Sequence, residues 1–508
     1  MEAIEGLLYG LGVAFTLNNL LAALVGALAG TLIGVLPGLG PTAGIAMILP
    51  LTYALDPTSG LIMMAGMYYG AMYGGSTTAI LINMPGESAS VITCIDGYKL
   101  TKKGRAGAVL TIVAVGSFVG GGLSVLGVML FAPALANVGL LFGPAEFFAL
   151  TAGGLLLFSR ISGGTLAAGI FPMAVGLMLS TVGQEIVTGA DRFTFGIRDL
   201  TLGVELVALV VGLYGVTEIM SVVESLQKQG KPIPVKLKEM FPSREEWRRS
   251  WGPYGRGTAM GFVLGLLPGP SATMASFASY RLEKGVSKYK EQLGEGAIEG
   301  VAGPETANNA AATSSMVPLL ALGIPFGSVT ALMLAAMMVH GVQPGPMMMT
   351  SHPEIFWGVI ASMLVGNAML VVLNIPLIGL WVSLLRVPNH VFLPIILMVA
   401  TIGCYSVRNS MVDVYMLWAI AMIGYALRKL EFQLAPLVVG VVLGPLIEKH
   451  LREGLFMSLG DVSVFYTSPI AIGIWSVVVI VLLLEPLRSL YGKLFGVKVK
   501  KLIPESSE

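Results

Sequence analysis

Charged residues and cysteines are scarce in this chain of 508 residues. Asp, Glu, Lys and Arg together make up 12% of it, about half the share of roughly 25% that is usual in soluble proteins. The two cysteines, Cys94 and Cys404, are too few for a disulfide framework. With 30 basic and 29 acidic residues, the chain has no broad basic surface for phosphates, which argues against nucleic-acid binding.

Motifs that hold cofactors, nucleotides or transition metals are also lacking. There is no Walker loop, no dinucleotide fingerprint and no G-x-S-x-G turn. Four histidines, His340, His352, His390 and His450, show no metal-ligand spacing. We therefore expect no cofactor, no transition metal and no ATP hydrolysis by the Walker route, so any energy requirement falls on an ion gradient or a partner.

Long apolar runs dominate what is present. Hydrophobic residues make up 55% of the chain, and the mean hydropathy is +0.82. A membrane-spanning helix needs about 20 apolar residues, and such runs occur at 108–132, 161–179, 200–220, 356–385, 415–427 and 470–484. These runs predict an all-α polytopic membrane protein.

The two halves of the chain share a weak internal repeat of Gly/Pro breaks. Segment 34–43 (GVLPGLGPTA) resembles 265–273 (GLLPGPSAT), and a second interrupted segment follows each at a similar spacing. Paired breaks of this kind point to a secondary transporter. We predict a first membrane repeat at 1–222, a basic cytoplasmic linker at 223–250, a second repeat at 251–467, and an extra transmembrane helix with a cytoplasmic tail at 468–508.

Basic residues indicate that the second repeat is inverted relative to the first. Lys and Arg favour cytoplasmic loops. They occur at 99–105 in the first half and at 281–290 in the second, whereas the equivalent loops, 341–353 and 52–60, contain none. Equivalent loops therefore face opposite sides. Each Pro-Gly break is interpreted as the tip of a re-entrant hairpin of two half-helices, with one kinked span as the alternative.

Neutral polar groups stand beside both breaks. A broken helix leaves backbone groups that lipid cannot satisfy, so they survive at membrane depth only where they face protein or water, and there they can bind solutes. We predict that a small organic anion is held by Ser76, Thr77, Thr78, Asn83, Asn308, Asn309, Thr313, Ser314 and Ser315. We predict that a coupling ion, sodium or a proton, is held around Pro37, Gly38, Gly40, Thr42, Pro268, Gly269 and Glu305.

Simpler roles for some of these residues stay open. Single hydroxyls such as Ser315 or Thr78 also serve close helix packing, and a Pro-Gly pair also kinks a helix. Glu305 could cap a helix N-terminus instead of taking a coupling cation.

As a set, the motifs resemble the TctA family, the large membrane subunit of tripartite tricarboxylate transporters. The resemblance covers nearly the whole chain and rests on 34–41, 73–76 with 79–81, 83–86 (NMPG), 96–98 (DGY), 304–311 (PETANNAA), 322–325 (LGIP), 192–196 (RFTFG) and 443–445 with Glu448 and Arg452. The family's most characteristic positions match Gly38, Gly40, Ser76, Asn83, Pro85, Asn308, Asn309 and Pro325.

The resemblance implies a multi-pass symporter in a prokaryotic cytoplasmic membrane, with its C-terminus in the cytoplasm. It would carry carboxylates such as citrate with sodium or protons, by an elevator-type mechanism. Implied partners are a small TctB-like membrane subunit of about four spans and an extracytoplasmic TctC-like solute-binding protein. The alternatives are an anion carrier without a binding protein, a channel, a non-conducting assembly subunit and a membrane-embedded enzyme.

Cysteine-accessibility mapping tests the inverted arrangement. In a variant without native cysteines, single cysteines at 99–105 and 281–290 should react with a membrane-impermeant thiol reagent from the same side, because both loops carry the basic residues. Labelling of these two segments from opposite sides would contradict the inverted repeat.

Overall fold

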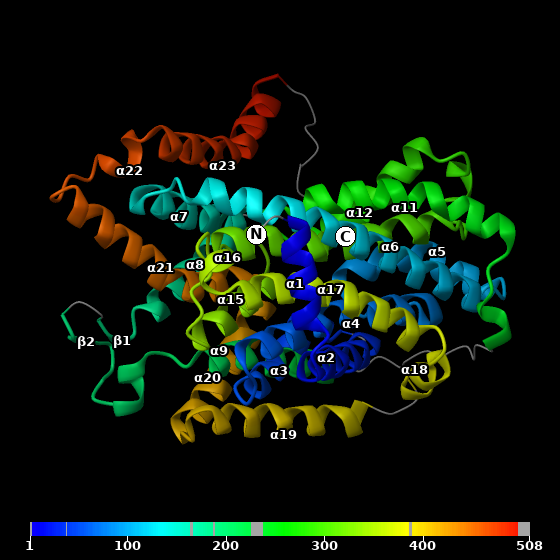
Figure 1. The fold of residues 1–508 in the computed structure, drawn as a ribbon, viewed down its shortest axis with the longest axis horizontal. Helices are drawn as coiled ribbons and strands as arrows, with labels where there is room; N and C mark the ends of the chain where they lie inside the picture. The colour runs from blue at the N-terminus through cyan, green and yellow to red at the C-terminus, as the bar shows by residue number, and fades with distance from the viewer. Residues whose placement is uncertain are drawn as a thin grey trace.

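The computed structural model describes residues 3–36, 38–162, 166–185, 188–224, 237–385 and 389–495. Apart from strands β1 (Gly183–Gln184) and β2 (Asp191–Arg192), which pair antiparallel, the regular elements of these residues are helices. Most long helices run along the longest dimension of the molecule (Figure 1). The predicted all-α class is confirmed.

Seven helical stretches in the described part of the chain are long and apolar enough to cross a membrane. They are Leu17–Val35, Ala106–Gly139, Pro144–Ser162, Leu206–Glu224, Pro353–Asn374, Val391–Arg408 and Met411–Lys429. The protein is therefore a multi-pass membrane protein.

In the first half of the chain, two pairs of helices are each separated by a short non-helical break, which we call an interrupted segment, and longer helices follow. Its elements are α1 (Ala3–Ala14), α2 (Leu17–Val35), α3 (Gly40–Thr52), α4 (Pro57–Ile82), η1 (Ser88–Ser90), α5 (Val91–Lys102), α6 (Ala106–Gly139), α7 (Pro144–Ser162), α8 (Leu166–Ser180), η2 (Arg198–Leu202), α9 (Leu206–Val210), the π-helical turn η3 (Val211–Val216) and α10 (Thr217–Glu224).

The second half repeats that order of interrupted segments. Its elements are η4 (Leu237–Met240), α11 (Arg244–Gly265), α12 (Ser271–Val286), η5 (Lys290–Gln292), α13 (Glu299–Ser314), α14 (Met316–Leu322), α15 (Ser328–Val339), α16 (Met348–Ser351), α17 (Pro353–Asn374), α18 (Ile378–Leu384), α19 (Asn389–Arg408), α20 (Met411–Lys429), α21 (Ala435–Met457), α22 (Val464–Thr467) and α23 (Pro469–Phe495).

Some predicted boundaries differ from the structure. The run at 356–385 is two helices, because α17 ends at Asn374 and Pro376 cannot continue the ladder of backbone hydrogen bonds. Helix α11 begins at Arg244, inside the predicted linker 223–250. Residues 225–236 of that linker and the tail 496–508 lie outside the described residues.

Each Pro-Gly break separates two antiparallel helices. In the first half, Gly44 of α3 packs against Ile33 of α2, close to the turn, and Thr52 at the end of α3 packs against Gly60 at the start of α4. In the second half, α12 runs back along α13, so that Gly303 lies beside Ser279. The chain therefore reverses at each break, and α2–α3 and α11–α12 are helical hairpins.

Glycines bring each hairpin against the helix that follows it. A Cβ built on any of six glycines would lie 2.1–2.5 Å from a carbonyl oxygen of that helix, so only glycine permits the approach. These are Gly26, Gly30 and Gly34, against Met63, Met67 and Ala71 of α4, and Gly257, Gly261 and Gly265, against Gly303, Ala307 and Ala311 of α13. The same four-residue step thus occurs in both halves.

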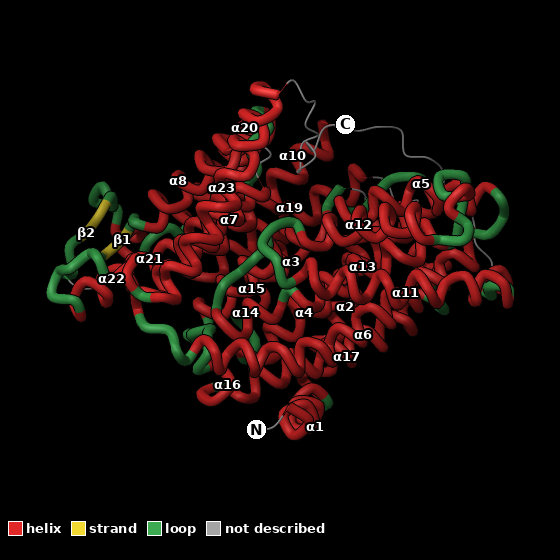
Figure 2. The backbone as a smooth tube through the Cα atoms, turned by 90° about the horizontal axis from the view of Figure 1, so that it is seen from above, coloured by secondary structure: helices red, strands yellow, loops and turns green. Residues whose placement is uncertain are grey.

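Helices α4 and α13 form the centre of the molecule (Figure 2), and nearly every residue of both is buried. They run antiparallel to each other. Ser76, late in α4, hydrogen-bonds to Glu305, early in α13, while Tyr68 of α4 and Ser315 at the end of α13 line a common cavity. The two hairpins consequently approach the centre from opposite ends.

The basic segments of the two halves meet at one end of the molecule. Lys99 pairs with Glu295 at 3.1 Å, and Arg105 pairs with Glu246 at 2.5 Å. At the other end, the ring of Tyr53 lies 5.9 Å from that of His340, which brings the two non-basic loops together. Figure 1 shows α5, α11 and α12 grouped at one end, away from β1 and β2.

The packing of glycine against the carbonyl oxygens can be tested on α11. Gly261→Ala places a Cβ 2.1 Å from the oxygen of Ala307 and should lower the free energy of unfolding by about 2 kcal/mol, measured by thermal unfolding in detergent. Gly255→Ala, on the same helix with nothing within 4 Å, is the control and should change stability by less than about 1 kcal/mol. Equal effects of the two changes would contradict the packing role.

Candidate functional site

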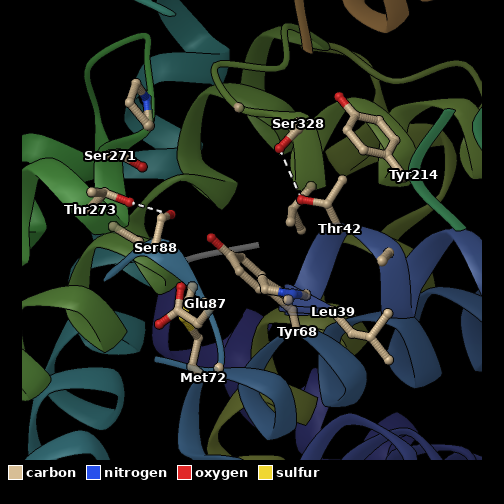
Figure 3. Close-up of a pocket in the computed structure, with 18 of the residues that line it drawn as sticks. Leu39, Thr42, Tyr68, Met72, Glu87, Ser88, Tyr214, Ser271, Thr273 and Ser328 are labelled. Carbon is tan, nitrogen blue, oxygen red and sulfur yellow. Dashed lines mark hydrogen bonds between the residues drawn. The ribbon is translucent and has the colours of Figure 1, made fainter. Parts of the chain in front are cut away.

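A cavity of about 510 Å³ lies where the two hairpin tips meet, within the range of about 300–1,000 Å³ typical of small-molecule sites. The tips contribute Gly38, Gly40 and Gly269, whose φ angles of 89°, 50° and 128° favour glycine. Their backbone therefore reaches the cavity without side chains in the way. Tyr68 extends its hydroxyl into the space between the tips (Figure 3).

Four helical segments begin at the wall of this cavity, with η1 and α5 counted as one continuous segment. Residues in the first turns of α3, α12 and α15 line it, as do Ser88 of η1 and Val91 at the start of α5. Neither α3 nor α12 has a side-chain cap at its start, although the N–H of Ser271, the first of α12, is bonded to the carbonyl of Gly269 at 2.8 Å. Free N–H groups and the positive ends of helix dipoles attract anions, so this geometry favours a negatively charged solute.

Two hydroxyl pairs join the halves across the cavity (Figure 3). Thr42 of the first hairpin lies 3.1 Å from Ser328 of the second half, between their Oγ atoms. Thr273 of the second hairpin lies 2.8 Å from Ser88 of the first half. Each hairpin tip is thus hydrogen-bonded to the interrupted segment of the opposite half.

A further wall comes from the π-helical turn η3 and from α20. Tyr214 reaches the cavity from η3, Glu218 from α10, which directly follows η3, and Arg428 from α20. Arg428 pairs with Glu218, with Nη2 3.2 Å from Oε1. Sequence reasoning missed these residues, although an acid within an apolar run is itself a functional signal. π-Helical turns also recur at functional sites.

The predicted site residues divide into two groups in the structure. Gly38, Gly40, Thr42, Gly269 and Ser315 line the cavity. The others that the structure describes lie outside its lining; they are Ser76, Thr77, Thr78, Asn83, Pro268, Glu305, Asn308, Asn309, Thr313 and Ser314. Pro37 lies outside the described residues.

The buried hydroxyls lie away from the cavity for a local reason. A Ser or Thr inside an apolar helix satisfies its O–H at a carbonyl three or four residues earlier. Thr78 donates to Gly75 at 3.0 Å in this way, and Ser314 donates to Ala311 at 3.4 Å. Asn83 instead ends α4 in a left-handed conformation, with φ of 58°, and is exposed.

Glu305 and the two asparagines form a polar cluster behind the tips. Glu305 is fully buried and accepts hydrogen bonds from Ser76 at 2.5 Å, from Asn308 at 3.1 Å and from Thr93. Asn309 donates to Asn308 at 2.7 Å. The cluster joins α4, α5 and α13, and therefore both halves of the chain.

Asp96 fixes the position of α5, which extends from the cavity to the basic end. It is fully buried, and its carboxylate accepts the backbone N–H groups of Gly294, Gly296 and Ala297 at 2.6–3.0 Å and the hydroxyl of Tyr280 at 2.9 Å. The loop between α12 and α13 therefore folds around a side chain of the first half.

Residues 20–439 match the model of the tripartite tricarboxylate transporter TctA family. The chain belongs to this family. A protein of Agrobacterium vitis named "Uncharacterized 52.8 kDa protein in TAR-I ttuC' 3'region" is 48% identical over 500 residues, 97% of this chain and 99% of the relative. Another from that organism, "Uncharacterized protein in TAR-II ttuC' 3'region", is 50% identical over 238 residues, 46% of this chain and 98% of the relative. No solved structure matches the chain.

Membership of the TctA family makes this protein a component of a tripartite transporter that works with other subunits. The matched region contains both hairpin tips, the cavity and the Glu305 cluster. The expected family resemblance is confirmed.

Removal of the Asp96 carboxylate tests how α5 is held in this TctA-family protein. Asp96→Ala leaves three backbone N–H groups without their acceptor and should lower the free energy of unfolding by about 3 kcal/mol. Tyr280→Phe removes one donor and leaves the carboxylate in place, so we expect a loss of about 1 kcal/mol. Thermal unfolding in detergent measures both, and a loss for Asp96→Ala no larger than for Tyr280→Phe would contradict this role.

Proposed function

We propose that this protein is the large permease subunit of a binding-protein-dependent secondary transporter that imports a small di- or tricarboxylate, such as citrate, by symport with sodium or protons. The observation that carries the proposal is the meeting of two glycine-rich hairpin tips and four helix starts at one hydroxyl-lined cavity. Backbone dipoles and neutral hydroxyls orient an anion without trapping it.

We assign the first contacts with the carboxylate to residues that line the cavity. These are the N–H groups in the first turns of α3 and α12, apart from that of Ser271, which is bonded to Gly269, together with the hydroxyls of Thr42, Thr273, Ser315 and Ser328. Ser76, Thr77, Thr78, Asn308, Asn309, Thr313 and Ser314 lie behind this layer and support it. The tips around Gly38, Gly40 and Gly269 are the proposed route of the coupling ion.

We propose that the two halves are inverted repeats that move as an elevator. Antiparallel α4 and α13, the matched glycine contacts and the basic segments gathered at one end support the inversion. In this mechanism the hairpins and interrupted segments move together against the wall that contains Glu218 and Arg428. Movement of this kind exposes a fixed site to each side in turn.

The proposed setting is a prokaryotic cytoplasmic membrane, with the basic end and the C-terminus in the cytoplasm. The proposed partners are a small TctB-like membrane subunit and an extracytoplasmic TctC-like solute-binding protein that delivers the carboxylate. Other subunits follow from the tripartite family; their identity is part of the proposal.

Uptake by reconstituted vesicles tests the function. The chain, co-reconstituted with its small subunit and supplied with the binding protein, should accumulate labelled citrate or another di- or tricarboxylate when a sodium or proton gradient is imposed. Absence of uptake of every carboxylate under both gradients would contradict the proposal.

The cavity assignment is tested with Thr42→Val/Thr273→Val. This double change removes one hydroxyl from each pair across the cavity and should raise the apparent KM by about tenfold or more. Thr350→Val is the control, because the Thr350 hydroxyl is bonded at 2.8 Å to Met347 of its own segment and lies outside the cavity lining. An unchanged KM in the double variant would remove these hydroxyls from the site.

A further inference from the structure

Glu305 is a buried acid without a basic partner. Its side chain is fully buried on α13, and no ion pair joins it to a Lys, Arg or His among the described residues. Two basic residues of adjacent α11 are already paired, Arg249 with Glu299 and Arg256 with Glu283, each at 2.7 Å. An unpaired charge at membrane depth is costly and is often functional.

The other ionisable groups around Glu305 do not neutralise it either. Glu87, which precedes η1, and Cys94 of α5 are close enough to act on it electrostatically. Tyr73 of α4 points its hydroxyl to the carbonyl of Ala114, at 3.3 Å. Asp96 of α5 is occupied by the backbone of residues 294–297. Among the described residues, a negative charge on Glu305 therefore meets neutral donors and a second acid.

The hydrogen bonds around Glu305 suit both of its protonation states. When it is ionised, Ser76 and Asn308 donate to Oε2, and Thr93 donates to Oε1. When Oε2 carries a proton, that O–H can donate to the Ser76 hydroxyl, which then turns to the carbonyl of Met72, 3.1 Å away. No polar group loses its partner in either state, so one proton can be taken up and released reversibly.

The same groups suit a metal cation poorly. A sodium ion needs several oxygen lone pairs directed at one point, whereas Asn308 presents an N–H group to the carboxylate. The side-chain oxygen of Asn308 is already the acceptor for Asn309, at 2.7 Å. This arrangement favours a proton over sodium at Glu305.

A single helical segment connects Glu305 with the cavity. Thr93, which donates to Glu305, lies five residues after Ser88, which is bonded to Thr273 at the cavity wall. Because η1 and α5 are continuous, a change in the bond between Thr93 and Glu305 can displace this wall. The charge of Glu305 and the shape of the cavity are thus mechanically linked.

We propose that Glu305 binds and releases the coupling proton of this transporter, and that Thr93 transmits its state through α5 to the cavity. This inference rests on the proposed carboxylate import and specifies its coupling ion. The proton comes from water on the extracytoplasmic side, forms the neutral acid on the Glu305 carboxylate, and returns to water on the cytoplasmic side, so that no other reactant is needed.

Glu305→Gln in the complete transporter, reconstituted in vesicles, separates coupling from transport. Labelled citrate, or whichever carboxylate the wild type accumulates, is the probe. Accumulation driven by an inward proton gradient should fall by about tenfold or more, because Gln cannot carry a proton. Exchange of internal labelled for external unlabelled substrate at equal pH needs no net proton movement and should persist within about twofold, with a flattened dependence on pH.

Two further variants complete the test. Cys94→Ser replaces one neutral group beside Thr93, a thiol that donates to the carbonyl of Ser90 at 3.8 Å, by another; it is the matched control and should keep both activities. Thr93→Val retains the acid but removes one donor to its ionised form. It should therefore shift the pH dependence of exchange toward higher pH. This shift tests the role of Glu305 even if Glu305→Gln fails to fold, and an unshifted pH dependence would contradict it.

Three results would overturn the assignment. The first is full proton-driven accumulation by Glu305→Gln. The second is a folded Glu305→Gln protein that has lost both exchange and accumulation. The third is wild-type uptake driven by sodium alone. Failure of the proposed function looks different, because the wild type would then neither accumulate nor exchange any carboxylate.

Discussion

Backbone N–H and C=O groups cannot be left facing hydrocarbon, and this constraint governs the centre of the molecule. Each half interrupts its helices twice, at Leu36–Leu39 and 83–87 in the first half and at 266–270 and 323–327 in the second. Lipid cannot satisfy the groups freed at these breaks. The breaks are instead gathered between α4 and α13, where they face each other across a cavity. The hairpins, the glycine contacts and the cavity all serve this requirement.

Close helix approach makes that gathering possible. The glycines of α2 and α11 let carbonyl oxygens of α4 and α13 sit where a Cβ would otherwise lie. In a membrane, packing rather than hydrophobicity holds helices together, so small residues at an interface are directly stabilising. Each hairpin is thereby held at a fixed height beside its partner helix, which places both tips at the same cavity.

Polar side chains in the core fall into two groups, according to which partners satisfy their hydrogen bonds. Hydroxyls within a continuous helix, such as Thr78, donate to a backbone carbonyl of their own helix and have little hydrogen-bonding capacity left for a ligand. Hydroxyls at helix starts, such as Thr42 and Thr273, bond across the cavity to a residue of the other half. Asp96 and Glu305 are both buried acids, yet Asp96 is fixed by backbone N–H groups while Glu305 is held by side chains from three helices. We propose that the second arrangement is the one that takes up and releases a proton.

The amino-acid sequence by itself determined the membrane class, the family, the two Gly/Pro breaks in each half and the swapped distribution of Lys and Arg. These follow from composition, periodicity and local motifs, which are properties of neighbouring residues. The sequence also pointed to Gly38, Gly40, Thr42, Gly269 and Ser315, because broken helices expose polar backbone wherever they occur. Tertiary structure alone decided which polar groups reach the cavity and which remain behind it. It set Tyr214, Glu218 and Arg428 opposite the tips, and it joined Glu305 to Ser76 and Thr93. Such pairings depend on contacts between helices more than 200 positions apart in the chain, for which the spacing of residues along the sequence has no signal.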